Sequence, residues 1–418
     1  MSNQFQSRPR SRGRLRSPPP TRTFAYRLKE IGQHAMWTLE DMLEEISTVH
    51  RILLCYSVAI SVAIEWLRLN HEDTLLSIFV EMVQFAVVVD CILIITYHLM
   101  HLSASNRMLA TVVYQTPLVT GPLAEFELTR LMLMENATTA ANIFLVGCMY
   151  AKPLVAGALC LVLHNLYIGG PGMQPHANIL TNVSKVFLRS AALAALFTYG
   201  VGLESLPILT AAAGDSLWLS RGVPILLLLS ISLACYFWYW YAEKYRDIAS
   251  KSYNSRRDPE WIVLLVCLVA LKLAAANLVH SVWKQIRGVA LTMDEDIAWE
   301  SSDAVVQFAI LPLATAAVDH LADISAAYRG DIYWSWISIC QSTLQTFFLI
   351  RPLFVLVGHD LDPRSGRIGI AMCFLGIALW LSLPIQSRLL KGSVLLLMYS
   401  GVVALCAAHF DYFNTHIS

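Results

Sequence analysis

The sequence predicts an all-α membrane protein of about eleven transmembrane helices, in which one extra N-terminal helix precedes two inverted repeats of about five helices each. Three observations predict this fold class. The 418 residues are 56% hydrophobic and only 14% charged, whereas a soluble domain usually carries about 25% charged residues. Apolar runs of about 20 residues, the length that crosses a bilayer, recur along the chain. The most polar internal stretch, residues 242–260, divides these runs into two groups.

We expect residues 1–50 to form a disordered, basic cytosolic tail that ends in an amphipathic segment before the first span. The first 25 residues hold six Arg and four Pro and lack an apolar run. From this composition we expect no cleaved secretory signal, and the segment is too polar to build a packed core. Because basic residues beside a membrane span stay in the cytosol, the tail places the N-terminus on the cytosolic side.

Residues 51–241 form the expected N-terminal membrane half. We expect Lys152 and Pro153 to separate two of its spans. The mixed segment 101–128 is a candidate for a re-entrant or interfacial piece. The candidate spans of this half are residues 52–68, 76–100, 129–150, 153–169, 187–209 and 222–241.

Residues 242–260 are a basic linker that the positive-inside rule places in the cytosol. The C-terminal membrane half, residues 261–418, follows it. The acidic loop 282–302 falls on the opposite side, which agrees with an odd number of spans. The candidate spans of this half are residues 261–281, 303–325, 333–358, 367–386 and 392–410.

A polar stretch interrupts the apolar pattern of the N-terminal half. Glu135, Thr138, Thr139 and Asn142 are three or four residues apart, so on one helix they share a face. Asn136 lies beside them. Ionisable groups inside a span are costly and by default mark a site or a pathway.

A second polar stretch lies in the C-terminal half. Thr315, Asp319 and Asp323 share a helix face, and His320 is their neighbour. Pro312 and the small residues around it predict a kink or a break, which would free backbone carbonyls for a cation.

The next span carries Ser342, Thr343 and Gln345. Carboxylate, amide and hydroxyl oxygens are the ligands that a hard cation such as Ca²⁺ prefers. A carboxylate in a partly dry site can also take up a proton, so proton and metal compete for it. The pattern therefore favours a cation site that is coupled to protons.

These residues resemble the vacuolar-type Ca²⁺/H⁺ exchangers of the cation/Ca²⁺ exchanger superfamily. Residues 302–320 resemble the family stretch S-E-x-F-x-G-L-I-x-L-P-I-x-G-N-A-A-E-H. Residues 341–345 with Pro352 resemble the family's G-S-S-I-Q and later Pro, and residues 391–399 resemble E-G-x-x-L-L-x-x-Y. The resemblance implies eleven spans, two inverted α-repeats and exchange of Ca²⁺ for protons.

The first α-repeat resembles the family's L-L-N-A-T-x-G-N-A-x-E-L-I in degenerate form, through residues 135–139 and then Asn165 in the next span. On this alignment Thr139 stands where the family has its N-terminal acid. In the second repeat, Ala316 replaces the family's Asn and Asp319 its Glu. Glu135 lies one helical turn before Thr139, so we hypothesise that it supplies the missing carboxylate.

The leading functional prediction is a proton-coupled antiporter of Ca²⁺ or another divalent cation in the vacuolar or another internal membrane, so a transporter is favoured over an enzyme. The expected partners are the lipid bilayer, Ca²⁺ and H⁺, with no nucleic acid and no resident cofactor. Asp319 and His320 are the candidate proton-coupling pair. The candidate metal ligands are Asp319, Glu135, Asn136, Gln345, Thr315, Ser342 and Thr343.

Two alternatives start from loss of ion exchange, because fewer ligands weaken a Ca²⁺ site heavily. In the first, the protein is a membrane enzyme acting on a lipophilic substrate, with Asp319 and His320 as an acid/base pair. In the second, it is a non-transporting regulator that works through the basic tail and the 242–260 linker.

Overall fold

The computed structural model describes residues 74–105, 122–168, 261–291, 304–328, 332–357, 375–381 and 387–408, with single positions at 59, 62, 373 and 383. Every regular element in these segments is helical. The helices, with π-helical turns written η, are α3 (Thr74–Ser105), α6 (Leu123–Met134), α7 (Thr138–Ala151), η1 (Lys152–Ala156), α8 (Gly157–Ile168), α12 (Trp261–Leu291), η2 (Val306–Ile310), α14 (Leu311–Tyr328), α15 (Ile332–Gln345), η3 (Thr346–Ile350), α16 (Arg351–Val357) and α18 (Arg388–Ala408).

Five helical segments among the described residues are long and apolar enough to cross a membrane. This agrees with an integral membrane protein, since each holds the roughly 20 residues that span hydrocarbon. They are Ser77–Thr96, Thr138–Asn165, Trp261–Gly288, Val306–Tyr328 and Arg388–Ala408.

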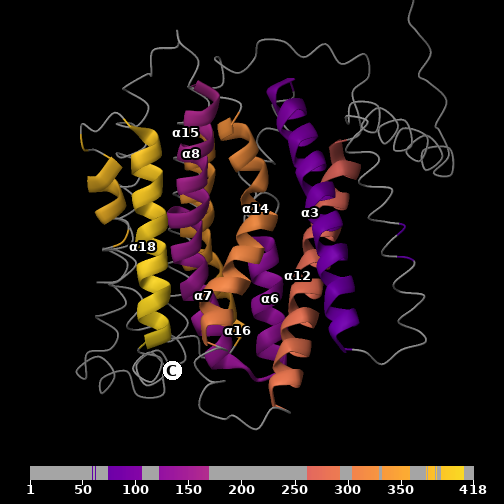
Figure 1. The fold of residues 1–418 in the computed structure, drawn as a ribbon. Coiled ribbons are helices and arrows are strands. Elements are labelled where there is room, and N and C mark those ends of the chain that lie inside the picture. Colours follow the sequence, from indigo (N-terminus) through magenta and orange to yellow (C-terminus); the bar gives the residue numbers. More distant parts are fainter. Residues whose placement is uncertain are drawn as a thin grey trace, which may run out of the picture.

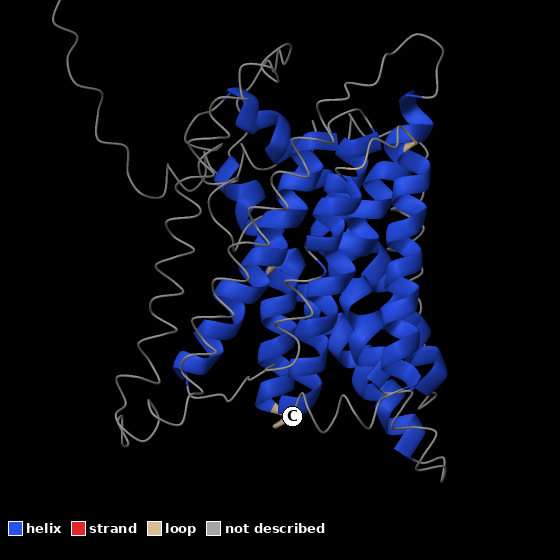
Figure 2. Ribbon diagram, turned by 90° about the vertical axis from the view of Figure 1, so that its left-hand side faces the viewer, coloured by secondary structure: helices blue, strands red, loops and turns tan. Residues whose placement is uncertain are grey.

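Two of these spans form the centre of the bundle. Protein buries 78% of Thr138–Asn165 and 61% of Val306–Tyr328, but only 22 to 33% of the other three. Figure 1 shows α14 in the middle, α18 at one side, and α3 and α12 at the other. Figure 2 shows the same upright bundle from the side. The apolar outer faces suit lipid, and the two central spans hold buried polar side chains that include Lys152 and Asp319.

Each of the three π-helical turns accompanies a proline. Pro153 lies inside η1, and Pro312 and Pro352 follow η2 and η3 by two residues. A proline ring clashes with the carbonyl four residues earlier, and one wider turn relieves this clash. The predicted kink or break at Pro312 is therefore a widened turn, and the helix continues through it.

The predicted boundary at Lys152 and Pro153 was wrong. Helices α7 and α8 join through η1 without interruption, so one span, Thr138–Asn165, replaces the predicted spans 129–150 and 153–169. The widened turn accommodates Pro153. As a result the charged Lys152 lies inside a span, where its side chain is fully buried.

The expected common face of Glu135, Thr138, Thr139 and Asn142 was also wrong. Helix α6 ends at Met134, and α7 begins only at Thr138. Asn136 takes a left-handed conformation with φ 59°. The backbone N–H of Asn136 donates to Leu133 O, and that of Ala137 donates to Met132 O. This is the Schellman pattern, in which a residue of positive φ ends a helix.

Two glycines permit close helix crossings. A Cβ on Gly147 of α7 would lie 2.2 Å from Phe308 O in η2 and 2.6 Å from Pro312 Cγ. A Cβ on Gly392 of α18 would lie 2.8 Å from Ala158 O in α8. Only glycine allows backbones to approach this closely, so α7 meets η2 and α14 almost backbone to backbone.

Two helix pairs share the same internal spacing. Corresponding ends of these elements are 194 residues apart. This spacing separates the ends of α6 and α14 (Met134 and Tyr328), the starts of α7 and α15, and the starts of η1 and η3. Helices α7 and α15 both have 14 residues before a five-residue π turn. Equal spacing of this kind is what two structural repeats produce. The inverted orientation and the full extent of the repeats stay predictions.

Several predicted features lie outside the described residues. They are the tail 1–50, most of the span 52–68, the spans 187–209 and 222–241, the linker 242–260 and most of the segment 101–128. The total number of spans and the membrane side of each loop also stay predictions.

Candidate functional site

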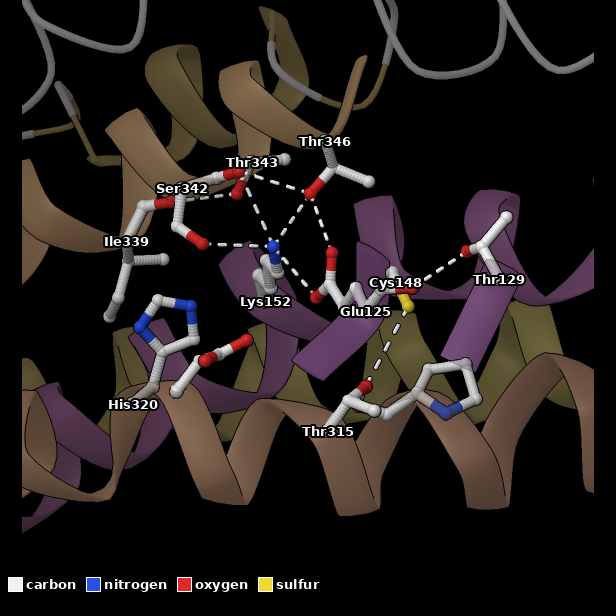
Figure 3. A network of polar contacts seen from close by, with 12 residues as sticks. Glu125, Thr129, Cys148, Lys152, Thr315, His320, Ile339, Ser342, Thr343 and Thr346 are labelled. Carbon is white, nitrogen blue, oxygen red and sulfur yellow. Dashed lines mark hydrogen bonds and ion pairs between the residues drawn. The ribbon is translucent and has the colours of Figure 1, made fainter. Parts of the chain in front are cut away.

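The Lys152 ammonium sits in a cage of oxygen atoms at the centre of the bundle (Figure 3). It lies 2.7 Å from Glu125 Oε1, 2.7 Å from Thr346 Oγ1, and 2.9 and 3.3 Å from Ser342 Oγ and O. We call these four atoms the oxygen cage. The side chains of Lys152 and Glu125 are fully buried, so the charges are removed from water and satisfy each other.

Three elements supply the oxygen cage, and a fourth supplies the lysine that it encloses. Glu125 comes from α6, Lys152 from η1, Ser342 from α15 and Thr346 from η3. The Thr346 hydroxyl lies 2.7 Å from Glu125 Oε2 and can donate to it. Figure 3 shows the side chains converging from helices of both halves of the chain. The cage therefore exists only where the two halves meet.

A second buried ion pair lies between α12 and α14. Lys272 Nζ donates to Asp319 Oδ1 at 2.8 Å, and the two side chains are 3% and 0% exposed. Asp319 Oδ2 is buried and accepts no hydrogen bond. The predicted acid of the C-terminal half is thus buried as expected, but a lysine neutralises it.

His320 is paired with Asp323 and not with Asp319. Its Nδ1 lies 2.8 Å from Asp323 Oδ2, and Ser338 Oγ donates to the same oxygen at 2.8 Å. His320 Nε2 is buried without a hydrogen-bond partner. The structure therefore does not support the predicted pairing of Asp319 with His320, because neighbouring residues on a helix point in different directions.

The two acids of the site are each matched by an ammonium group. Glu125 faces Lys152, and Asp319 faces Lys272. Burial of an unpaired charge costs several kcal/mol or more, so each lysine makes it possible to keep a carboxylate at membrane depth. In this state the two ion pairs carry no excess negative charge.

Other predicted ligands are buried nearby with mostly local partners. The Thr315 hydroxyl donates to carbonyls one turn earlier in α14 and lies 3.8 Å from Cys148 Sγ. Thr343 Oγ1 donates to Ile339 O at 2.7 Å. Gln345 is buried, and its Oε1 accepts no hydrogen bond. Of the predicted set, Ser342 alone contributes to the oxygen cage.

Glu135 and Asn136 lie in the exposed link between α6 and α7. Glu135 Oε1 is 2.6 Å from Lys284 Nζ, and Oε2 is 3.5 Å from His280 Nε2. Partial burial works to raise the pKa of Glu135, but the hydrogen bond from Lys284 and the charges of His280, Lys284 and Arg287 lower it below its ordinary value. Glu135 therefore holds α12 to this link and does not face Asp319.

Sequence reasoning missed Glu125, Lys152, Lys272 and Thr346. The equal spacing of the helices could have identified Glu125 as a site residue. Glu125 and Asp319 are themselves 194 residues apart, as are Lys152 and Thr346. Glu125 therefore occupies in α6 the position that Asp319 occupies in α14. Within the described segments, no three His, Cys, Asp or Glu side chains gather as metal ligands would.

A third buried lysine, Lys391, stands where the exchanger motif that residues 391–399 resemble has a glutamate. Lys391 Nζ donates to Leu381 O at 2.7 Å and to Leu383 O at 2.9 Å. Backbone carbonyls, and not a carboxylate, satisfy this ammonium. Lys391 thus joins α18 to the segment before it and contributes nothing to the oxygen cage.

Residues 259–408 match the family described as sodium/calcium exchanger protein. No curated protein sequence matches the chain significantly. The matched range contains the motifs at 302–320, 341–345 and 391–399.

Two solved structures resemble the chain along most of its length. Native YfkE is 15% identical with a TM-score of 0.52, covering 85% of this chain and 98% of that one. A selenium-substituted crystal structure described as Ca²⁺/H⁺ antiporter protein YfkE is 16% identical with a TM-score of 0.54, covering 86% and 98%. At this identity the similarity establishes the fold. Residues 259–408 therefore resemble the sodium/calcium exchanger family, and the chain shares its fold with the two YfkE structures.

Proposed function

We propose that the protein is an antiporter that exchanges Ca²⁺, or another divalent cation, for protons across an internal membrane. The oxygen cage is the observation that carries this proposal. Carboxylate, hydroxyl and carbonyl oxygens from both halves converge on one positive charge, the Lys152 ammonium. These are the oxygen types that bind hard cations. The exchanger domain and fold, and the antiporter named among the similar structures, support the same function.

Charge balance gives a reason for proton coupling. The carboxylates of Glu125 and Asp319 are neutralised by Lys152 and Lys272. A divalent cation that binds there adds positive charge to a neutral, buried region, and an uncompensated buried charge is strongly unfavourable. Loss of one proton from each of the two ammonium groups, about two protons per divalent ion, would restore the balance. Cation binding is then coupled to proton release.

The test is ⁴⁵Ca²⁺ uptake into vesicles that contain the purified protein, with an acid-inside pH gradient. We expect uptake above that of empty vesicles, and loss of it when an uncoupler removes the gradient. Asp319→Asn and Glu125→Gln should each reduce the rate by roughly 10²-fold or more, because each removes a buried carboxylate of the site.

Glu127→Gln is the matched control for Glu125→Gln. Glu127 lies on the same helix, but its carboxylate pairs with Arg130 on that helix at 2.6 Å. We expect this variant to keep wild-type uptake. Folded wild-type protein that moves no Ca²⁺ under a pH gradient would refute the proposal, and so would equal uptake by Glu125→Gln.

The internal membrane, with the vacuole as the first candidate, belongs to the same proposal. An acidic organelle supplies the proton gradient that drives such exchange, and its lumen stores the cation. Fluorescence of a C-terminally tagged chain against organelle markers tests this point. Exclusive labelling of the plasma membrane would contradict it.

The two lysines favour one alternative, in which the exchanger fold has lost cation exchange. Both acids are already neutralised within the chain. The dyad of His320 and Asp323 also offers a buried imidazole Nε2 without a hydrogen-bond partner, which suits acid/base chemistry on a lipophilic molecule. Proton-driven uptake that depends on Glu125 and Asp319 would exclude this alternative.

A further inference from the structure

Lys152 occupies its cage as a bound cation would. Its ammonium is enclosed by one carboxylate oxygen, two hydroxyl oxygens and one backbone carbonyl oxygen, within 2.7 to 3.3 Å. The buried ammonium of Lys391 meets only two backbone carbonyls, whereas this one meets a mixed set of oxygens of the kind that coordinates a hard cation. Its side chain is fully buried, so the ammonium and a second cation cannot share the cage.

The Glu125 contact supports this interpretation. Glu125 Oε1 lies 2.7 Å from the ammonium, yet this oxygen receives no well-directed hydrogen bond. Charge attraction and not hydrogen-bond direction therefore holds the pair. A spherical ion, which has no directional preference, suits such an oxygen at least as well as an ammonium.

The size of the oxygen cage indicates which cations fit. Ca²⁺ binds oxygens at about 2.3–2.6 Å, and Mg²⁺ demands about 2.0–2.1 Å in octahedral geometry. The cage oxygens lie 2.7 to 3.3 Å from the Lys152 nitrogen. The oxygens must therefore move inward to reach Ca²⁺ distances, and further inward, into octahedral geometry, to reach Mg²⁺ distances.

We propose that Lys152 is a tethered cation, which competes with the transported ion for the oxygen cage and thereby sets the affinity and selectivity of the site. This inference rests on the proposed function, because it takes the cage to be the cation site. An external cation binds only in molecules whose ammonium has left the cage. The apparent dissociation constant is then the intrinsic one divided by the fraction of molecules with a vacant cage.

Removal of the ammonium should therefore strengthen cation binding. If the ammonium leaves the cage in no more than about a tenth of the molecules, its removal tightens binding at least about ten-fold. Lys152→Met keeps the length of the side chain without its charge. We would measure equilibrium ⁴⁵Ca²⁺ binding to purified wild type and Lys152→Met in lipid nanodiscs, with a monodisperse size-exclusion peak as proof of folding.

Three further variants make the test specific. Lys152→Gln repeats the measurement with a polar neutral side chain, so the test does not depend on one variant that folds. Lys391→Met removes another buried ammonium, which lies on α18 and touches no acid, and it should leave Ca²⁺ affinity unchanged. In the double variant Lys152→Met/Glu125→Gln, the gained affinity should disappear. Mg²⁺ should displace ⁴⁵Ca²⁺ from Lys152→Met only weakly.

The outcomes separate this inference from the proposed function. Tighter binding in both Lys152 variants, lost with Glu125→Gln, supports the tethered cation even if wild-type vesicles show no uptake, in which case the proposed function alone fails. Wild-type affinity in both variants overturns the inference, even where wild-type uptake is driven by protons. An equal gain in Lys391→Met also overturns it, because the effect would then be general.

Discussion

At the scale of single residues, lysines determine the net charge of the site. The two equivalent acids of α6 and α14 each face an ammonium from another element, Glu125 facing Lys152 and Asp319 facing Lys272. A buried pair of this kind is weak evidence for stability, since desolvation offsets much of the attraction. Loss of one partner is nevertheless costly, because the remaining charge has no water to solvate it.

The pair of Lys272 and Asp319 gives a prediction at this scale. Lys272→Met should destabilise the protein by roughly 3–5 kcal/mol, because it leaves the Asp319 carboxylate buried and uncompensated. Thermal unfolding of purified protein in detergent measures the effect. Adding Asp319→Asn to Lys272→Met should recover much of the loss, since the residual charge is then gone. A double variant that is less stable than Lys272→Met would show that the unpaired Asp319 carboxylate does not cause the loss of stability.

At the scale of helices, prolines and glycines set how closely the central elements pack. The π turn η1 lets one span run past Pro153 and places Lys152 at its widened turn. Gly147, one turn and a half earlier, lets α7 lie against η2. These two features together bring the element that carries Lys152 against the half that carries Ser342 and Thr346.

The crossing at Gly147 gives a prediction for this scale. Gly147→Val should destabilise the protein by at least about 2–3 kcal/mol, because its Cβ alone would lie 2.2 Å from a backbone oxygen. Gly401→Val is the matched control, since a Cβ there meets nothing within 4 Å. We expect the control to change stability by less than about 0.5 kcal/mol. Thermal unfolding compares them, and equal melting temperatures would show that the crossing is looser than described.

At the scale of the whole molecule, the site belongs to neither half alone. Glu125 and Lys152 come from the N-terminal half, while Ser342, Thr346 and Asp319 come from the C-terminal half. A cation that binds between two halves can face either side of the membrane when the halves rock against each other. This placement suits alternating access better than a site within one helix would.

The basic tail gives a prediction at this scale. If transport is the function, deletion of residues 1–25 should leave the rate of proton-driven ⁴⁵Ca²⁺ uptake within about two-fold of wild type, because such a polar segment adds no ligand to the membrane site. Vesicle uptake measures this, with protein amounts matched by quantitative blotting. A loss of the protein's cellular effect without loss of uptake would point instead to a regulatory role of the tail.

The apolar composition and the motifs of residues 302–399 predicted a helical membrane protein that resembles the exchangers. The helical fold and the match of residues 259–408 to the sodium/calcium exchanger family agree with this prediction. The buried acid at Asp319 was also found from its motif. The N-terminal half was harder, because its motif has diverged and the prediction aligned Glu135 where the structure has a helix end. The acid that faces the site, Glu125, lay in a segment too polar to be recognised as a span.

The sequence by itself determined that this is a membrane protein and where the acid of its C-terminal half lies. Apolar composition and local motifs show both without tertiary information. Only the tertiary structure decided what the acids meet. Lys152 lies far along the chain from Ser342 and Thr346, and Lys272 is 47 residues before Asp319. Partner choice across such separations depends on helix packing, and here packing put ammonium groups beside both carboxylates.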